Sequence, residues 1–385
     1  MPYFDHNATA PLHPAARAAW LEVAEAAWHN PSGLYPQATL ARQRLEDARE
    51  RLADLLDAEP ARIVFTGGAT AAANLVARSL ATHAPPPSTV VMSGLEHPCV
   101  ADSLAVAFQE RCGMLPVDAG GLVELDAVEA AVSGPAARLV AVMAASNESG
   151  VVQPWQEIAR VCRARGAAFF CDASQWLGKR SAAGLGACDW LIGSSHKVGG
   201  PRGMGFLLVP EGQPFRGDLG GPQEMGRHAG TEDIASVVAM VAALESREQD
   251  IASGTASQSA ARDAAERWLL EQLPQAVIVS RLAPRLFNTL AVVIPGGDGK
   301  RIVGALGRAG IAASTGSACS AGAGSSPQVL SAIGAERLGL EPADLRGMVR
   351  LSGGWETTPE EWQQAVASLA AVVRGTAARP PQVRL

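Results

Sequence analysis

Lysine is rare in this chain, and one lysine lies among residues suited to amine chemistry. Only three of the 32 lysines and arginines are lysines, so a lysine kept at one place indicates that its own chemistry is needed there. Lys197 follows the apolar run 190–193 and has two serines, a histidine and a glycine-rich turn as neighbours. A desolvated lysine, unlike an arginine, can lose its proton and act as a nucleophile or form a Schiff base. A solvated loop lysine is the alternative interpretation for an isolated residue.

A glycine-containing turn at residues 66–70 could hold an anion. It reads Thr-Gly-Gly-Ala-Thr and lies between an apolar, strand-like run and a helix-like segment. Glycines let the backbone approach a ligand closely, and the first turn of a helix offers free N–H groups to a phosphate. An ordinary turn, with Thr70 capping the helix, is the alternative.

Two further polar clusters follow apolar runs. Asp172 ends the run 168–171, where it could pair with a cationic ligand atom or merely cap the next helix. His97, after the run near residue 90, could be a structural residue, a ring that stacks on a flat ligand, or an acid and base. With Lys197 and the turn at 66–70, these residues suggest a flat, phosphorylated carbonyl compound with a basic ring nitrogen, which describes pyridoxal 5′-phosphate (PLP).

The elements that must position these residues alternate between strand and helix from about residue 60 to 210. Near-continuous apolar strands separated by helices predict a parallel sheet with helices on both faces. Right-handed crossovers would bring the carboxyl ends of the strands, where the four clusters fall, to one edge of the sheet. The fold class is therefore α/β, with a mostly parallel central sheet and a smaller α+β domain.

The domain organisation follows from a change of composition after a predicted helix at 234–251. Residues 253–259 are small and polar, and an α+β pattern follows them. We expect a large α/β domain at 15–252 that binds the cofactor. Residues 1–14 and 253–385 would form the small domain, which carries a mobile loop at about 314–327.

Composition excludes several classes of protein. The net charge of −6 and the absence of a basic stripe argue against direct nucleic-acid binding. No apolar run reaches membrane-spanning length, the first residues do not resemble a signal peptide, and we expect a cytoplasmic protein. The six scattered cysteines include no C-x-x-C pair, which predicts reduced thiols and no metal site.

Motifs along nearly the whole chain resemble those of cysteine desulfurases, the NifS/IscS-like enzymes of the class V, fold-type I PLP-dependent group. The matching stretches are Tyr3-Phe4-Asp5-His6-Asn7-Ala8-Thr9-Ala10-Pro11, Asn30-Pro31-Ser32, Gly68-Ala69-Thr70, Glu96-His97, Ser146-Asn147-Glu148-Ser149-Gly150, Asp172-Ala173-Ser174-Gln175, Ser194-Ser195-His196-Lys197, Arg227-His228-Ala229-Gly230-Thr231 and Gly316-Ser317-Ala318-Cys319.

The resemblance implies a fold-type I PLP-transferase fold and a role for each matching residue. Lys197 would bind the cofactor as a Schiff base and then move protons, and Asp172 would keep the pyridine nitrogen protonated. His97 would stack on the ring and exchange protons, and Gln175 would hydrogen-bond the ring hydroxyl. The phosphate would be bound by Ala69, Thr70, Ser194 and His196. A threonine placed as Thr231 reaches the neighbouring subunit's phosphate in this family, which implies a homodimer with shared sites.

The resemblance also assigns the substrate L-cysteine to a group of residues near the cofactor. Arg350 would grip its carboxylate, because a planar guanidinium can make two parallel hydrogen bonds. Asn147 would add a hydrogen bond, and Asn7 and Ala8 would line the same mouth. Taken alone, an arginine beside apolar residues is more often part of an ion pair.

Cys319 distinguishes sulfur chemistry from other PLP reactions. Twelve of the fourteen residues at 314–327 are Gly, Ala, Ser or Thr, a composition too small and polar to pack firmly. The resemblance implies that the thiolate of Cys319 takes the sulfur as a persulfide and passes it to an acceptor protein. A cysteine in this loop could instead be incidental, and Cys99 is a weaker reactive candidate.

Two other functions remain open. One is another class V activity, such as a selenocysteine lyase, a cysteine-derivative lyase, an aminotransferase or an epimerase, in which Cys319 is dispensable. The other is a catalytically idle binding subunit, although the lysine, aspartate and cysteine are all present. The pathway that receives the sulfur is not readable from the sequence.

Overall fold

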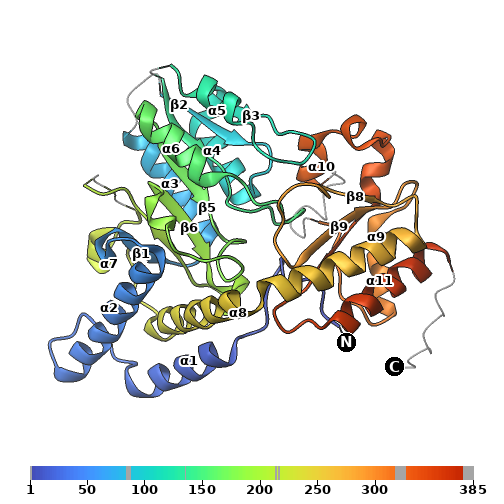
Figure 1. Cartoon of the computed structure of the whole chain (residues 1–385). Helices are drawn as coiled ribbons and strands as arrows, with labels where there is room; N and C mark the ends of the chain where they lie inside the picture. The colour runs from blue at the N-terminus through green and yellow to red at the C-terminus, as the bar shows by residue number, and fades with distance from the viewer. Residues whose placement is uncertain are drawn as a thin grey trace.

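The computed structural model contains two β-sheets, and one long helix runs beneath both of them (Figure 1). It describes residues 2–83, 88–134, 136–212, 215, 217–316 and 327–375. Cys319 and most of the predicted mobile loop lie outside the described residues. The strands are β1 (Ile63–Thr66), β2 (Thr89–Ser93), β3 (Cys112–Leu115), β4 (Ala137–Ala141), β5 (Ala168–Asp172), β6 (Trp190–Ser194), β7 (Gly205–Leu208), β8 (Val277–Ile278), β9 (Thr289–Val293) and β10 (Met348–Ser352). The α-helices are α1 (Pro14–Ala26), α2 (Pro36–Leu56), α3 (Ala69–His83), α4 (Pro98–Phe108), α5 (Leu125–Ala131), α6 (Trp155–Arg165), α7 (Gln223–Gly226), α8 (Ile234–Gln272), α9 (Gly299–Arg308), α10 (Gln328–Ile333) and α11 (Pro359–Val373).

The large sheet is mostly parallel, which confirms the predicted fold class. Its seven strands lie in the order β1-β7-β6-β5-β4-β2-β3. The five strands from β6 to β3 pair in parallel, whereas β7 is antiparallel to both of its neighbours. All five parallel strands therefore end at the same edge of the sheet, as ligand sites in α/β folds require.

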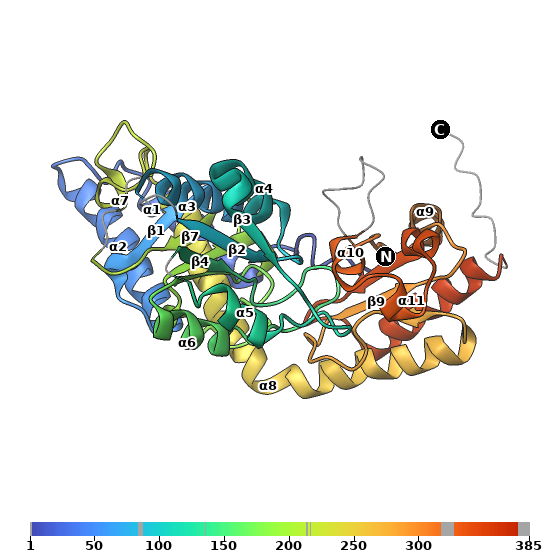
Figure 2. The ribbon, with the colours of Figure 1, turned by 90° about the horizontal axis from the view of Figure 1, so that it is seen from above.

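Helices cover both faces of the large sheet because successive strand residues point in opposite directions. Phe170 and Ile192 pack with α3 and α4, while their neighbours Phe169 and Leu191 pack with α2, α6 and α8. Figure 2 shows α3 and α4 on one side of the sheet and α5, α6 and α8 on the other. Burial on both faces explains the near-continuous apolar character of these strands.

Helix α8 is longer than the sequence suggested. The helix predicted at 234–251 continues without interruption to Gln272, through the small polar residues 253–259. Packing overrides their weak helix preference, since Ala265 and Leu269 join the core formed with β9, β10 and α11. The division into 15–252 and the remainder stays a proposal, in which α8 crosses the boundary.

The small sheet is antiparallel, in the order β10-β9-β8, and it incorporates the start of the chain. Tyr3 forms a bridge with Ala312, and Asp5 forms one with Ser352. Phe4 is fully buried against Trp362, with ring centroids 4.8 Å apart. Residues 2–9 are thereby fixed between the small sheet and the large one.

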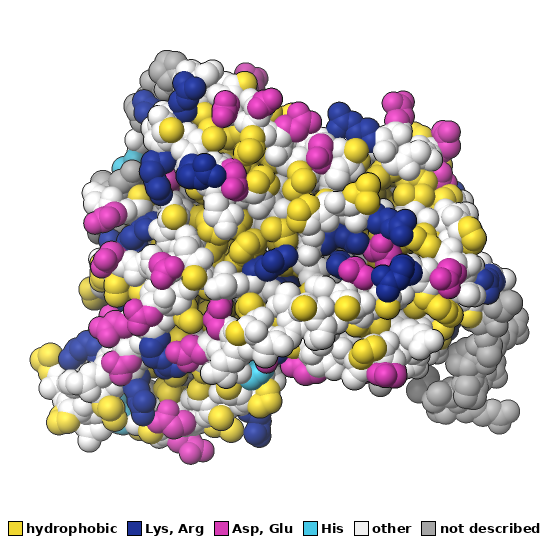
Figure 3. Space-filling view, in the orientation of Figure 1, with side chains coloured by type: hydrophobic (Ala, Val, Ile, Leu, Met, Phe, Trp, Pro, Cys, Tyr) yellow, Lys and Arg dark blue, Asp and Glu magenta, His cyan; other side chains and the backbone are white. Residues whose placement is uncertain are grey.

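Charged side chains of both signs are distributed over the visible face of the molecule (Figure 3). Basic side chains form no extended track on the described part of that face. Within the described ranges, the helices are too short or too polar to span a lipid bilayer.

Candidate functional site

A cavity of about 300 Å³ lies at the edge where the parallel strands end. Most of its walls come from the turns after β1, β2, β5 and β6, which carry the four clusters identified in the sequence. The loop after β4 adds a fifth segment. Its lining residues are Ala8, Gly67, Gly68, Ala69, Thr70, His97, Cys99, Met143, Ala145, Asn147, Asp172, Ser174, Gln175, Ser194, His196, Lys197, Gly203 and Met204.

Lys197 enters the cavity from a single 3₁₀ turn that directly follows β6. Its Nζ donates hydrogen bonds to the backbone carbonyls of Asn7, at 2.5 Å, and Ala8, at 2.8 Å. The short turn and the N-terminal segment therefore hold the amine at the carboxyl edge of the sheet.

Asp172 ends β5 and is buried at the wall of the cavity. Its Oδ1 accepts a hydrogen bond from the backbone N–H of Ser174 at 2.8 Å, so one oxygen closes the local turn. Ser174 Oγ also borders the cavity and is buried without a partner among the described residues. Because buried hydroxyls are normally satisfied, this oxygen indicates a place for a ligand.

His97 caps helix α4 and lines the cavity. Its Nδ1 accepts a hydrogen bond from the backbone N–H of Cys99 at 3.2 Å, so the neutral ring carries its proton on Nε2. Burial lowers the pKa of His97, nearby Asp172 raises it, and Lys197 lowers it further. His97 is thus neutral at pH 7 and able to accept a proton.

The turn after β1 is shaped to receive an anion. Gly68 has φ of +127°, a conformation that favours glycine, and a Cβ added at Gly67 or Gly68 would meet no atom within 4 Å. Ala69 and Thr70 form the first turn of α3, which offers its N–H groups to the same open space.

Ser194 and His196 approach this space from the end of β6. His196 Nδ1 lies 3.1 Å from Thr9 Oγ1. Burial, with help from Lys197 and Arg202, lowers the pKa of His196 to about 4. Its ring is therefore a neutral hydrogen-bonding group at pH 7.

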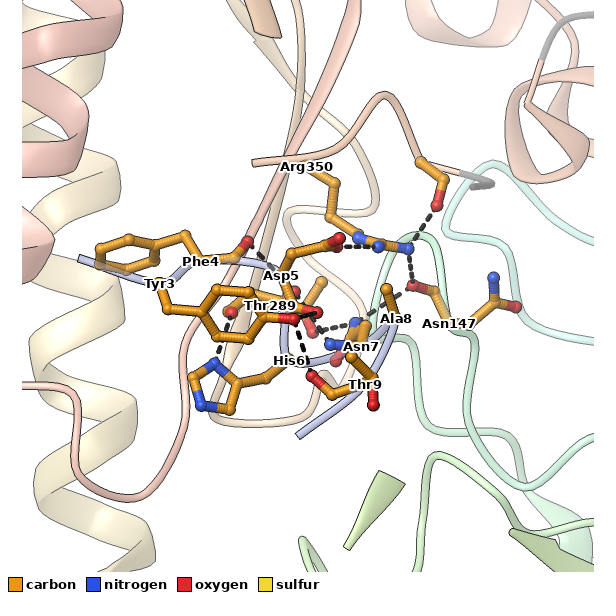
Figure 4. A network of polar contacts seen from close by, with 12 residues as sticks. Tyr3, Phe4, Asp5, His6, Asn7, Ala8, Thr9, Asn147, Thr289 and Arg350 are labelled. Atoms are coloured by element: carbon orange, nitrogen blue, oxygen red, sulfur yellow. Dashed lines mark hydrogen bonds and ion pairs between the residues drawn. The ribbon is translucent and has the colours of Figure 1, made fainter. Parts of the chain in front are cut away.

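Arg350, the predicted substrate arginine, is only 1% exposed and lies in β10. Its Nη2 forms an ion pair with Asp5 Oδ1 at 2.6 Å, and its Nη1 donates to the carbonyls of Asn147, at 2.8 Å, and Gly316. Figure 4 shows the Arg350 guanidinium between Asp5 of the N-terminal segment and the Asn147 carbonyl. Nε is buried without a partner among the described residues, and Arg350 is not among the residues that line the cavity.

Of the other residues predicted to bind substrate, Asn147 and Ala8 line the cavity. Asn7 is buried behind it, and its Nδ2 donates to the Asn147 carbonyl at 3.1 Å and to Thr289 Oγ1 at 2.9 Å. Its carbonyl accepts from Lys197 and from Gln175 Nε2, the latter at 2.8 Å. Asn7 therefore connects the substrate residues to the lysine.

Thr231 is exposed and borders a second cavity of about 310 Å³, together with Trp28, His29 and Asn30. It also borders a cavity of about 170 Å³ whose residues Gly67, Gly203 and Met204 line the first cavity as well.

Three polar residues next to the site had no assigned role in the sequence. The partly buried Asp5 holds Arg350, the buried Lys179 donates to Gln175, and Glu96, which precedes His97, is fully buried. Because lysine is rare in this chain, the argument that singled out Lys197 applies equally to Lys179 and could have identified it as a site residue.

The comparisons with known proteins cover nearly the whole chain. The family Aminotransferase class-V matches residues 2–364. The cysteine desulfurase of Nostoc sp. (strain PCC 7120 / SAG 25.82 / UTEX 2576) is 32% identical over 383 residues, which cover 98% of this chain and 94% of that protein. The cysteine desulfurase of Klebsiella pneumoniae is 34% identical over 378 residues, covering 96% and 92%.

Solved structures show the same similarity. A NifS-like protein superimposes with a TM-score of 0.87 at 26% identity, covering 97% of this chain and 99% of that one. The structure of SspA in complex with cysteine gives a TM-score of 0.76 at 27% identity, covering 91% and 98%.

Proposed function

We propose that this chain, which belongs to the aminotransferase class-V family, is a PLP-dependent cysteine desulfurase. The enzyme would convert L-cysteine to L-alanine and carry the sulfur as a persulfide on Cys319. The observation that carries this proposal is the meeting of Lys197, Asp172 and His97 with an open glycine turn around one cavity.

The residues present fit PLP. The unpartnered Ser174 Oγ and the open space at Gly67 and Gly68 support a polar, phosphorylated ligand in the cavity. Lys197, Asp172, Gln175 and His97 would hold the ring, and Ala69, Thr70, Ser194 and His196 the phosphate. When bound, PLP supplies a conjugated ring that accepts electrons from the substrate carbon.

The chain's own residues would orient the substrate and move its protons. The Arg350 guanidinium, fixed by Asp5, would receive the substrate carboxylate, and the Asn147 side chain would add a hydrogen bond at the cavity wall. The Lys197 amine, which lines the cavity, would exchange a proton with the substrate carbon. Burial lowers the pKa of the His97 imidazole, so the ring is uncharged at pH 7 and would take up a proton from the substrate only transiently.

Cys319 would act as the sulfur nucleophile. Its thiolate would form an S–S bond with the substrate's sulfur while the substrate's C–S bond breaks, and the carbon would take a proton to give alanine. The loop composition, with twelve small residues in fourteen, suits a thiol that must then deliver its sulfur to an acceptor protein.

Substrate turnover by two cysteine variants tests this function. The purified protein with PLP, L-cysteine and a thiol reductant should release alanine and sulfide. Cys319→Ala should abolish both products and keep the cofactor's visible absorbance. Cys99→Ala is the matched control, since Cys99 lines the cavity, and it should keep measurable turnover. Sulfide release at the wild-type rate by Cys319→Ala would contradict the assigned nucleophile and favour another class V activity.

We also propose that the enzyme is a homodimer with shared sites. Trp28 is 72% exposed and Leu34 fully exposed, an unusual exposure for large apolar side chains. They lie on the segment that joins α1 and α2, and Trp28 borders the second cavity beside Thr231. A second copy covering this segment would bring its own cofactor site towards Thr231.

A further inference from the structure

Lys179 is a buried lysine that the proposed reaction does not use. Only 5% of it is exposed, and its Nζ donates hydrogen bonds to Gln175 Oε1 and, at 3.3 Å, to Asn7 Oδ1. Both acceptors belong to the site, since Gln175 lines the cavity and the Asn7 carbonyl accepts from Lys197. Lys179 therefore reaches the site through these two side chains.

Electrostatics do not explain why a lysine is kept there. Among the described residues, it forms no salt bridge with a carboxylate. Burial holds its pKa well below the usual value, and the positive charges of Lys197 and Arg350 lower it further. Burying an amine in such a place is costly unless its hydrogen bonds are needed.

The hydrogen bonds of Lys179 have a definite consequence for Gln175. The oxygen and nitrogen ends of a glutamine amide differ in chemistry but hardly in shape. The amine can donate at least two N–H bonds, and it makes them to two amide oxygens. It thereby fixes Gln175 with Oε1 turned towards Lys179 and Nε2 turned away.

The opposite end of the amide agrees with this orientation. Gln175 Nε2 donates to the Asn7 carbonyl at 2.8 Å. Among the described residues it makes no other hydrogen bond, so its second N–H is left for a ligand in the cavity. A reversed amide would place an oxygen against the Asn7 carbonyl and against any ligand oxygen.

We propose that Lys179 is a positioning residue, which orients the Gln175 amide so that its N–H faces an oxygen on the ring of the bound cofactor. The inference rests on the proposed function, because it requires PLP in the cavity. A donated N–H stabilises negative charge on the ring oxygen. Loss of Lys179 would therefore make the bound cofactor harder to deprotonate.

The test is a pH titration of the visible absorption band of the PLP-loaded protein without substrate. Lys179→Met should keep the band but raise the midpoint pH of its titration by roughly one unit, a tenfold change in proton affinity. This is the size expected for the loss of one hydrogen bond to a charged oxygen. Lys300→Met, the same change at an exposed lysine, should leave the midpoint in place.

A double-mutant cycle separates positioning from a direct effect of charge. Gln175→Ala should raise the midpoint by itself, and adding Lys179→Met should then raise it no further, because the lysine acts through Gln175. An unchanged midpoint in Lys179→Met, or an equal further shift on the Gln175→Ala background, would overturn the inference.

Two controls keep the result interpretable. If Lys179→Met does not fold, Lys179→Leu is titrated instead. Leucine cannot donate a hydrogen bond to Gln175, so an upward shift supports the inference and an unchanged midpoint overturns it. A wild-type protein that forms no visible band with PLP would contradict the proposed function, whereas a normal wild-type band with unmoved variants contradicts only the role of Lys179.

Discussion

The charge states of the site residues follow from how deeply each is buried. His97 and His196 both lose affinity for a proton because water is excluded from them. At neutral pH the cavity therefore holds two uncharged imidazoles, one over the cofactor's expected ring and one at its phosphate. The anionic ligand would have to be held mainly by backbone N–H groups, hydroxyls and Lys197.

Glu96 gives the fold a pH dependence of its own. Its Oε1 accepts hydrogen bonds from Ser93 Oγ, at 2.5 Å, and from the backbone N–H of Met143, at 2.8 Å. Burial nevertheless raises its pKa from 4.5 to about 8, and the like charge of Asp172 adds to the effect. The folded protein therefore binds a proton there that the unfolded chain releases near pH 4.5.

We predict that the free energy of unfolding falls as pH rises from about 4.5 to 8, and that Glu96→Gln removes this part of the fall. Between pH 5.5 and 8.5 the variant should gain about 3 kcal/mol relative to wild type. Urea unfolding of both proteins at the two pH values measures it, with exposed Glu110→Gln as the control. A difference that stays constant with pH would contradict the prediction.

Much of the site could be predicted from single residues because of where they fall. Asp172, His97 and Lys197 each follow an apolar strand closely, and parallel strands bring their carboxyl ends together. Asp5 and Lys179 could not be assigned in the same way. Asp5 meets Arg350 from 345 residues away, and the role of Lys179 depends on which atom of an amide it contacts.

Among the secondary-structure elements, α8 shows the limit of local composition. Residues 253–259 are small and polar, which favours a break, yet they form the middle of a 39-residue helix. Contacts with distant segments decide the matter: Gln258 Nε2 donates to the Trp355 carbonyl at 2.7 Å. The mostly parallel pairing of the large sheet was predictable from the alternation of strands and helices, whereas nothing in that alternation indicated the antiparallel β7.

A proline in this part of α8 tests its continuity. Ala256→Pro should lower the free energy of unfolding by about 3 kcal/mol or more, because proline removes a helical hydrogen bond and clashes with the preceding turn. Ala256 is exposed, so Ala256→Ser is a fair control and should cost well under 1 kcal/mol. Equal stability of the two variants in urea unfolding would indicate a loop at this position.

For the molecule as a whole, the proposed dimer can be tested through the number of chains in the assembly. The apolar segment between α1 and α2 leaves Leu34 and Trp28 in water, next to the cavity that contains Thr231. Leu34→Asp should convert the proposed dimer to a monomer and reduce cofactor retention, because the partner's Thr231 position would be lost.

Sedimentation at micromolar concentration measures the mass, and visible absorbance measures the cofactor. Leu282→Asp is the matched control, because Leu282 is 99% exposed but lies on the loop between β8 and β9. It should sediment like wild type. A Leu34→Asp protein with unchanged mass, or a monomeric wild type, would contradict the proposed dimer.

The path of residues 2–9 has a practical consequence for anyone producing this enzyme. Their backbone is hydrogen-bonded to the small sheet and then accepts from the amine of Lys197. Any extension or substitution that displaces residues 2–9 would therefore shift the two carbonyls that hold the Lys197 amine, so a tagged protein should be compared with an untagged one for cofactor retention.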